Sequence, residues 1–137
     1  MKKLILTILL ITLSFGYSDI KVTDIISVYD GDTFKINIAG YPDIIGEKIS
    51  IRINGIDTPE KRGKCKKEKI LAIKAQNYTH QKLMNAKEII LKNPQRDKYF
   101  RIVADVYVDG HKLIDGLLEQ GLGVRYGGGA KVRDWCK

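Results

Sequence analysis

Apolar and polar residues alternate along the first third of the chain in the way that half-buried strands require. Residues 20–29 and 34–38 are rich in β-branched and aromatic side chains and flank an Asp-Gly pair, which predicts a hairpin. Residues 39–46 have turn chemistry, and residues 48–56 then alternate strictly. Three isoleucines share one face of this third strand, so we expect Arg52 to point away from the packed side.

The pattern becomes helical over residues 64–86, which are rich in Lys, Ala, Leu and Gln and contain no Gly or Pro. Residues 88–91 and 102–108 read as strands on either side of a polar segment. Residues 111–120 predict a short amphipathic helix that ends at Gly121. Three strands, a helix, two strands and a second helix predict an α+β domain. We expect a five-stranded OB-fold β-barrel with two to three helices.

The first residues differ from the rest in composition. A basic head is followed by the apolar run 4–15 and by small residues before position 19, which predicts a secretory signal peptide over 1–18 and one domain over 19–137. The alternative is a membrane anchor, but a span needs about 20 apolar residues. We therefore expect export to the periplasm or the outside, with no stable membrane anchor after cleavage.

The chain is basic, with 24 Lys and Arg against 16 Asp and Glu and a net charge of +8. Removal of the signal peptide takes away Lys2 and Lys3 and lowers this charge by two, to +6. A positive surface of this size attracts polyanions such as nucleic acid. The alternative is that the charge only keeps the protein soluble.

Two cysteines are present, Cys65 and Cys136. An even count in an oxidising compartment favours one disulfide, although two free thiols remain an alternative. Two cysteines so far apart lack the paired spacing of zinc sites.

Acidic residues stand where predicted strands begin and end. Asp30-Gly31 is ordinary turn chemistry, but Asp32, directly after the turn, has no turn role of its own. Asp57 follows the third strand, with Glu60 three residues later. Hard oxygen ligands gathered in this way suit Ca²⁺ or Mg²⁺.

Arg101 precedes a later strand and could form, with Arg52, a pair of guanidinium groups for a phosphate. The alternative for the charged segment around Arg101 is a solvated loop.

These segments carry a resemblance to a known family. DGDTFKI, RINGIDTPE, DKYFRIVADVYVDG and LLEQGLGVRY resemble the staphylococcal-nuclease-like, or thermonuclease, family in order and spacing over residues 20–126. The resemblance implies an OB-fold and a secreted, Ca²⁺-dependent endonuclease. Such an enzyme hydrolyses phosphodiester bonds of DNA and RNA and leaves 3′-phosphate ends.

The resemblance also implies roles for individual residues. By position, the carboxylates of Asp32 and Asp57 and the backbone carbonyl of Thr58 would bind Ca²⁺, and Glu60 would be the general base. The remaining matches are to groups that hold phosphate or substrate: Arg52 and Arg101 at the scissile phosphate, Lys98 and Tyr99 at a terminal phosphate, and Tyr126 near the bases.

The chain also departs from the family pattern. Phe100 stands before Arg101 where the family often has glycine, so a bulky ring is expected close to the phosphate site. The C-terminal helix of longer members is reduced, and we hypothesise that a Cys65–Cys136 bridge anchors the tail instead. We expect a monomer. The alternative function is a catalytically weak OB-fold nucleic-acid-binding protein of the cell envelope, but a pure binder has no use for Glu60.

Overall fold

The computed structural model describes residues 18–137. The expected signal peptide therefore lies, apart from Ser18, outside the described residues. Within residues 18–137, no helix has the length and apolar character that a membrane crossing needs.

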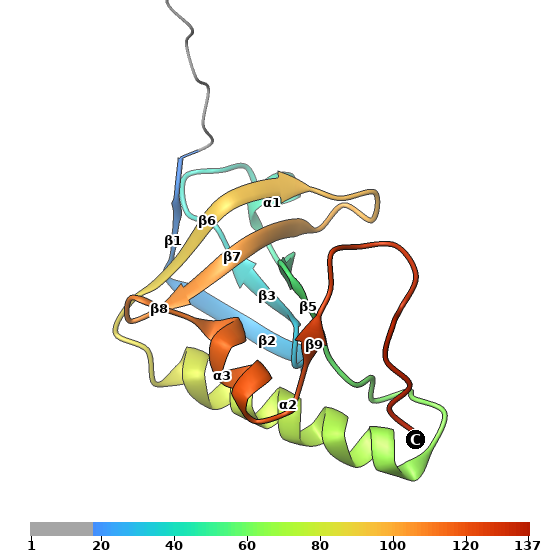
Figure 1. Cartoon of the computed structure of the whole chain (residues 1–137). Helices are drawn as coiled ribbons and strands as arrows, with labels where there is room; N and C mark the ends of the chain where they lie inside the picture. The colour runs from blue at the N-terminus through green and yellow to red at the C-terminus, as the bar shows by residue number, and fades with distance from the viewer. Residues whose placement is uncertain (1–17) are drawn as a thin grey trace, which may run out of the picture.

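A curled sheet forms the body of the molecule (Figure 1), and its strands follow the order β1-β6-β7-β4-β3-β2, with β8 paired to β7. Its strands are β1 (Ile20–Val22), β2 (Asp24–Asp30), β3 (Thr33–Asn37), β4 (Ile49–Ile53), β6 (Ile89–Arg96), β7 (Ile102–Val108) and β8 (His111–Lys112). All its pairs are antiparallel except β4 with β7, which run parallel. A separate two-stranded ladder joins β5 (Ile56–Asp57) to β9 (Val124–Arg125). The expected α+β, OB-like architecture is confirmed, with the sheet curled into a half-barrel.

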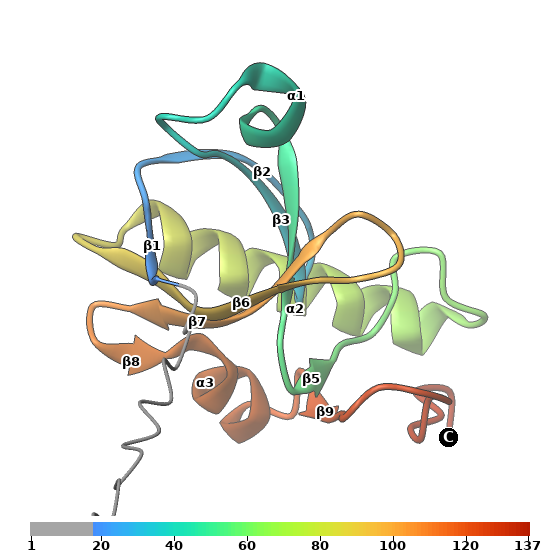
Figure 2. The ribbon, with the colours of Figure 1, turned by 90° about the horizontal axis from the view of Figure 1, so that it is seen from above.

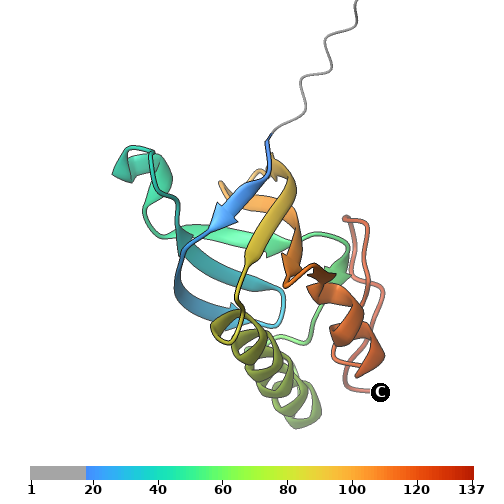
Figure 3. The same ribbon diagram turned by 90° about the vertical axis from the view of Figure 1, so that its left-hand side faces the viewer.

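Within residues 18–137, three helices accompany the sheet: α1 (Asp43–Gly46), α2 (Lys66–Met84) and α3 (Leu113–Glu119). The long helix α2 lies across one end of the curled sheet, beside α3, as Figures 1 and 3 both show. Seen from above, in Figure 2, α1 stands apart from the other two helices, at the far end of β3 and β4. The chain ends beside the start of α2 (Figure 1), where the Cys65–Cys136 disulfide ties the two segments together.

The core is built by the alternation that the sequence displays. Along β4 the burial pattern alternates strictly, and its three isoleucines are at most 6% exposed. Phe34 and Ile36 from β3 and Leu91 from β6 are fully buried beside them. Burial of one such side chain stabilises the fold by about 1.5–3 kcal/mol, so this inner face is the main source of stability. The opposite face of β4 is left for polar residues.

Three differences from the expected elements have local causes. Residues 43–46, expected to be loop, form one helical turn, and residues 124–125 of the expected tail loop form β9. The strand expected at 88–91 continues as β6 to Arg96 because the pairing with β7 resumes beyond an irregularity after Lys92. The helical turn is too short for a periodic signal, β9 depends on a distant partner strand, and the extension of β6 depends on hairpin pairing across a polar segment.

Candidate active site

Most of the predicted site residues line one cavity of about 440 Å³. The predicted members are Asp32, Arg52, Asp57, Thr58, Glu60, Tyr99, Arg101 and Tyr126, and four further members are Tyr29, Asp30, Thr33 and Lys131. Lys98 does not line the cavity: it is exposed, with its ammonium 5.1 Å from the centre of the Tyr99 ring.

Helix α2 packs against the turn at residues 30–32 and holds it in place. Gly31 lies so close to α2 that an added Cβ would stand 2.6 Å from the Cβ of Ala75, which only glycine avoids. The Thr79 hydroxyl donates to the Gly31 carbonyl at 2.6 Å, and the Gln76 amide donates to the Val28 carbonyl at 2.8 Å. Helix α2 therefore fixes the tip of the β2–β3 hairpin, and with it the start of the cavity wall at Asp32.

Asp32 is almost fully buried and is oriented by three donors. The backbone N–H and the hydroxyl of Thr58 both donate to its Oδ2 at 2.9 Å, and the Thr33 hydroxyl donates to its Oδ1 at 2.9 Å. The Arg52 guanidinium lies 3.0 Å from the same Oδ2. The turn residue Asp30 also lines the cavity, and burial followed by repulsion from Asp32 raises its pKa.

Asp57 is buried with one carboxylate oxygen unsatisfied, and the neighbouring cavity residue Asp30 also has one such oxygen within residues 18–137. The Asp57 side chain is 5% exposed, and its Oδ2 is buried without a hydrogen-bond partner among the described residues. The other oxygen, Oδ1, faces the Lys131 ammonium at 3.4 Å and the Arg52 guanidinium at 3.7 Å. Burial raises the pKa of Asp57, although Lys131 opposes that shift. A buried carboxylate oxygen with no donor is the kind of atom that a bound cation satisfies.

The residues of this wall fit a hard divalent cation. Asp32 directly precedes β3, Asp57 is the last residue of β5, and Thr58 follows Asp57 with its backbone carbonyl. All three residues are buried, and oxygen is the ligand that Ca²⁺ and Mg²⁺ prefer. A second group of possible metal ligands, Cys65, Glu68 and Cys136, has its cysteines joined in the disulfide and lacks the all-oxygen character of a calcium site.

The register of the sheet places the two arginines side by side. In the parallel pair of β4 with β7, Arg52 lies opposite Val103. Since side chains repeat every second residue along a strand, Arg101 falls on the same face of the sheet as Val103 and Arg52. Both arginines line the 440 Å³ cavity and also a smaller cavity of about 240 Å³. The two guanidinium groups are thus available to one anion.

Arg101 is held in place by Asp97. Its Nε–H and its backbone N–H donate to the Asp97 carboxylate at 2.8 and 3.0 Å. Burial by itself raises the pKa of Asp97, but these hydrogen bonds and one from the backbone of Tyr99 outweigh it, and the pKa is lowered. The terminal amino groups of Arg101 make no hydrogen bond within residues 18–137 and are left for a ligand.

Glu60 lies at the exposed mouth of the cavity. Its backbone N–H and that of Lys64 donate to the Glu68 carboxylate at 3.4 and 3.0 Å, which ties the loop to the first turn of α2. Its own carboxylate accepts a hydrogen bond from Lys131 at 2.5 Å.

Sequence reasoning missed Lys131, Asp97 and Glu68. For Lys131 only the disulfide hypothesis offered a signal, because it returns the tail to this region.

Phe100 does not fill the site. It adopts φ = 63°, a left-handed conformation that glycine tolerates better, in agreement with the glycine often found there in the family. Its ring, however, packs on the Arg96 guanidinium with a centroid distance of 4.0 Å, and Phe100 is not part of the cavity wall. The expectation of a bulky ring close to the phosphate site is not met.

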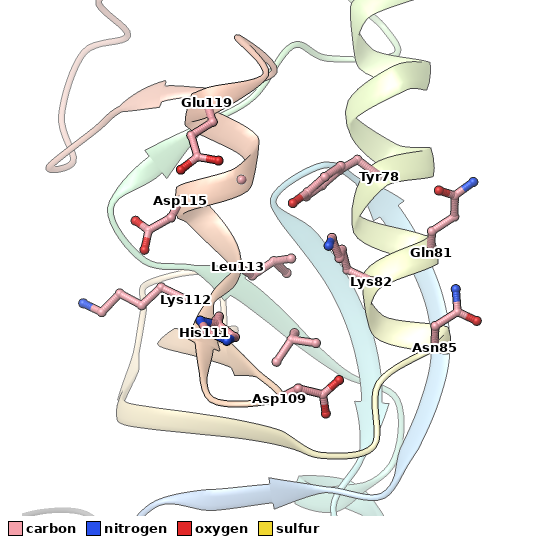
Figure 4. Close-up of a pocket in the computed structure, with 12 residues that line it drawn as sticks. Tyr78, Gln81, Lys82, Asn85, Asp109, His111, Lys112, Leu113, Asp115 and Glu119 are labelled. Atoms are coloured by element: carbon pink, nitrogen blue, oxygen red, sulfur yellow. The ribbon is translucent and has the colours of Figure 1, made fainter.

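A larger cavity of about 650 Å³ lies between α2, α3 and the β7–β8 turn. Figure 4 shows its side chains spread along both rims, with Gln81 on α2 and Asp115 on α3 pointing away from each other. Its charged groups do not converge on one point. The larger cavity is therefore a weaker candidate for an active site than the 440 Å³ cavity that holds Asp32 and Asp57.

The family comparison agrees with this geometry. The sequence model of the family described as staphylococcal nuclease homologue matches residues 50–133, more than half of the chain. The matched segment contains Arg52, Asp57, Glu60 and Arg101 and ends beyond Lys131. Members of this family are usually nucleases and typically use Ca²⁺. The disulfide is in keeping with an oxidising environment. The chain belongs to the staphylococcal nuclease homologue family.

Proposed function

We propose that the protein is an exported, Ca²⁺-dependent endonuclease that hydrolyses the phosphodiester bonds of DNA and RNA and leaves 3′-phosphate ends. The observation that carries the proposal is the convergence of two carboxylates, two arginines and a glutamate, from separate parts of the sequence, on one cavity. Neither solubility nor packing explains why these charges share so small a volume. The basic surface supports a polyanionic substrate.

The residues divide the work of phosphodiester hydrolysis. Asp32, Asp57 and the carbonyl of Thr58 would hold Ca²⁺. When bound, that ion supplies Lewis-acid neutralisation of charge on the phosphate oxygens. Arg52 and Arg101 donate hydrogen bonds to the non-bridging oxygens, whose charge grows as the water attacks. Both arginines are already oriented, Arg52 by Asp32 and Arg101 by Asp97, so little reorganisation is needed.

Glu60 would accept the proton. Its carboxylate lines the cavity, where it can serve as general base for an attacking water. As the water oxygen forms its bond to phosphorus, one of its protons passes to a carboxylate oxygen of Glu60. The bond from phosphorus to the 5′ oxygen then breaks, and that oxygen takes a proton from solvent. The product on the other side is a 3′-phosphate.

The test is digestion of plasmid and single-stranded DNA by the purified protein and by Glu60→Gln, with Ca²⁺, with Mg²⁺ and with EDTA. We expect Ca²⁺-dependent cutting that falls by about 10²–10⁴-fold in the variant, the usual contribution of a general base. Glu119→Gln, an exposed change on α3, is the matched control and should cut normally. Retarded but uncut DNA, unaffected by metal, would instead indicate a nucleic-acid-binding protein of the cell envelope.

A further inference from the structure

The C-terminal segment, residues 126–137, forms a strap beside the cavity. It starts from β9, whose Val124 pairs with Asp57 across the small ladder. It turns at Gly128 and Gly129, with φ of 97° and 84°, which residues with side chains rarely adopt. It ends at the buried ring of Trp135 and at the disulfide from Cys136 to Cys65. Both ends of the strap are therefore fixed.

The strap delivers one ammonium group to the acidic side of the cavity. Lys131, midway along it, donates to Glu60 Oε1 at 2.5 Å and lies 3.4 Å from Asp57 Oδ1. These are the proposed general base and one proposed cation ligand. Lys131 thus bridges two carboxylates that would otherwise repel each other.

Lys131 differs from the other cation at Asp57 in its freedom to leave. The Arg52 side chain is 13% exposed and is bonded to Asp32 and to the Ile53 carbonyl. The Lys131 side chain is 48% exposed and ends a flexible four-carbon stem. Of the two, only Lys131 can swing into solvent without leaving a buried charge unpaired.

We propose that Lys131 is a positioning residue that acts as a tethered competitor for the cation site, binding Asp57 and Glu60 until a divalent cation displaces its ammonium from Asp57. The inference rests on the proposed function, because it takes Asp57 to be a cation ligand. It assigns two consequences to one side chain. Lys131 holds the Asp57 and Glu60 carboxylates together in the absence of the ion, and it raises the ion concentration that the site requires.

A purely structural role for Lys131 is the competing explanation. The strap, however, is already anchored by β9, by Trp135 and by the disulfide, none of which involves Lys131. The pair of Lys131 with Glu60 is exposed on both sides, and exposed ion pairs add little stability. The two explanations predict different ion affinities for a variant without the Lys131 ammonium. Loss of a competitor raises the affinity for the ion, whereas loss of a purely structural contact does not.

The test is ion binding without substrate. Tyr29, Tyr99 and Tyr126 line the cavity and can sensitise the luminescence of bound Tb³⁺, from which Ca²⁺ is then titrated as a competitor. We expect Lys131→Met to lower the Ca²⁺ dissociation constant about five- to tenfold, as removal of one nearby positive charge implies. Lys131→Gln should behave in the same way, and Lys131→Arg should stay close to the wild type.

The matched control is Lys74→Met, which removes the same charge from the exposed side of α2 and should change the affinity less than twofold. If the wild type binds Ca²⁺ and both Lys131→Met and Lys131→Gln bind it no more tightly than the wild type does, this inference alone is overturned. Absence of Ca²⁺ binding from the wild type and both neutral variants would overturn it together with the proposed cation site.

Discussion

The two sides of the cavity are built by different means. One side, the wall half, comes from regular structure and its immediate ends, and its side chains are buried; it consists of Asp32, Arg52, Asp57 and Thr58. The other, the loop half, comes from connecting segments and the tail, and is more exposed; it consists of Glu60, Arg101, Tyr126 and Lys131. Strand pairing and helix α2 hold the wall half, whereas local hydrogen bonds and one disulfide hold most of the loop half.

Two carboxylates, Asp57 in the wall half and Asp97 beside the loop half, have pKa values shifted in opposite directions. Burial raises the pKa of Asp57, in the wall half, so its charged form is held at a cost to folding. Hydrogen bonds outweigh burial at Asp97, which supports the loop half, and lower its pKa. Charged groups that lower folding stability because they are buried in a cavity are common in functional sites. The comparison predicts that damage to the wall half affects both stability and activity.

The largest effect should come from removing one arginine from each half. Arg52→Met leaves Asp32 buried without its ion-pair partner and leaves Asp57 with Lys131 alone, so we expect a loss of about 3–5 kcal/mol in the free energy of unfolding. Arg101→Met should cost about 1 kcal/mol or less, because its pair is more exposed. Each change should slow DNA cleavage by at least about 10²-fold.

Urea denaturation and cleavage rates measure the two quantities separately. Equal losses of stability in the two arginine variants would contradict the division into a structural and a local half.

Removal of the disulfide should come next. The bridge closes a sequence separation of 71 residues, and its loss in Cys65→Ser/Cys136→Ser should destabilise the protein by about 2–4 kcal/mol. Since the wall half does not depend on the strap, the folded variant should still cleave DNA. Thermal unfolding and a cleavage assay well below the midpoint test both statements. A folded variant without any cleavage would show that the strap is essential to the chemistry.

The pH dependence of stability should differ between wild type and Asp97→Asn. A lowered pKa in the folded protein means that Asp97 stabilises it fully above the ordinary value of 3.8 and loses that contribution as pH falls through the folded pKa. The stability difference between the two proteins should therefore shrink below about pH 4. Urea titrations from pH 6 to pH 3 measure this difference. A gap that widens toward low pH would contradict the lowered pKa.

The smallest effect should come from Phe100→Gly. The change relieves the positive φ but loses the packing on Arg96, so we expect a net stability change within about 1 kcal/mol. Cleavage should change less than twofold because the ring does not line the cavity. A large gain in the cleavage rate would mean that Phe100 disturbs Arg101 after all.

The wall half could be predicted from the sequence because its signals are local. Alternation along residues 49–53 placed Arg52 on the polar face, and the Asp-Gly turn placed Asp32 at a strand start. The loop half was predictable only in part. Arg101 was proposed from its place before a strand and again from the family resemblance, whereas its partner Asp97 and the contribution of Lys131 depend on the folding of loops and tail.

The same reason explains the missed elements of the fold. Strand β9 has two residues and exists because it pairs with β5, 67 positions away between Asp57 and Val124. A two-residue strand carries no periodicity, so its presence depends on the tertiary structure alone. The Cys65–Cys136 bridge, in contrast, was anticipated from an even cysteine count and an exported context, and the structure contains it.

The measurement that tests the central claim most directly is a time course of supercoiled plasmid cleavage by the purified wild-type protein, with Ca²⁺ and with EDTA, followed by analysis of the ends. We predict nicked and then fragmented DNA only with Ca²⁺, and fragments that carry 3′-phosphates. Intact plasmid in both conditions, with the protein bound to it, would contradict the account of this cavity as a nuclease active site.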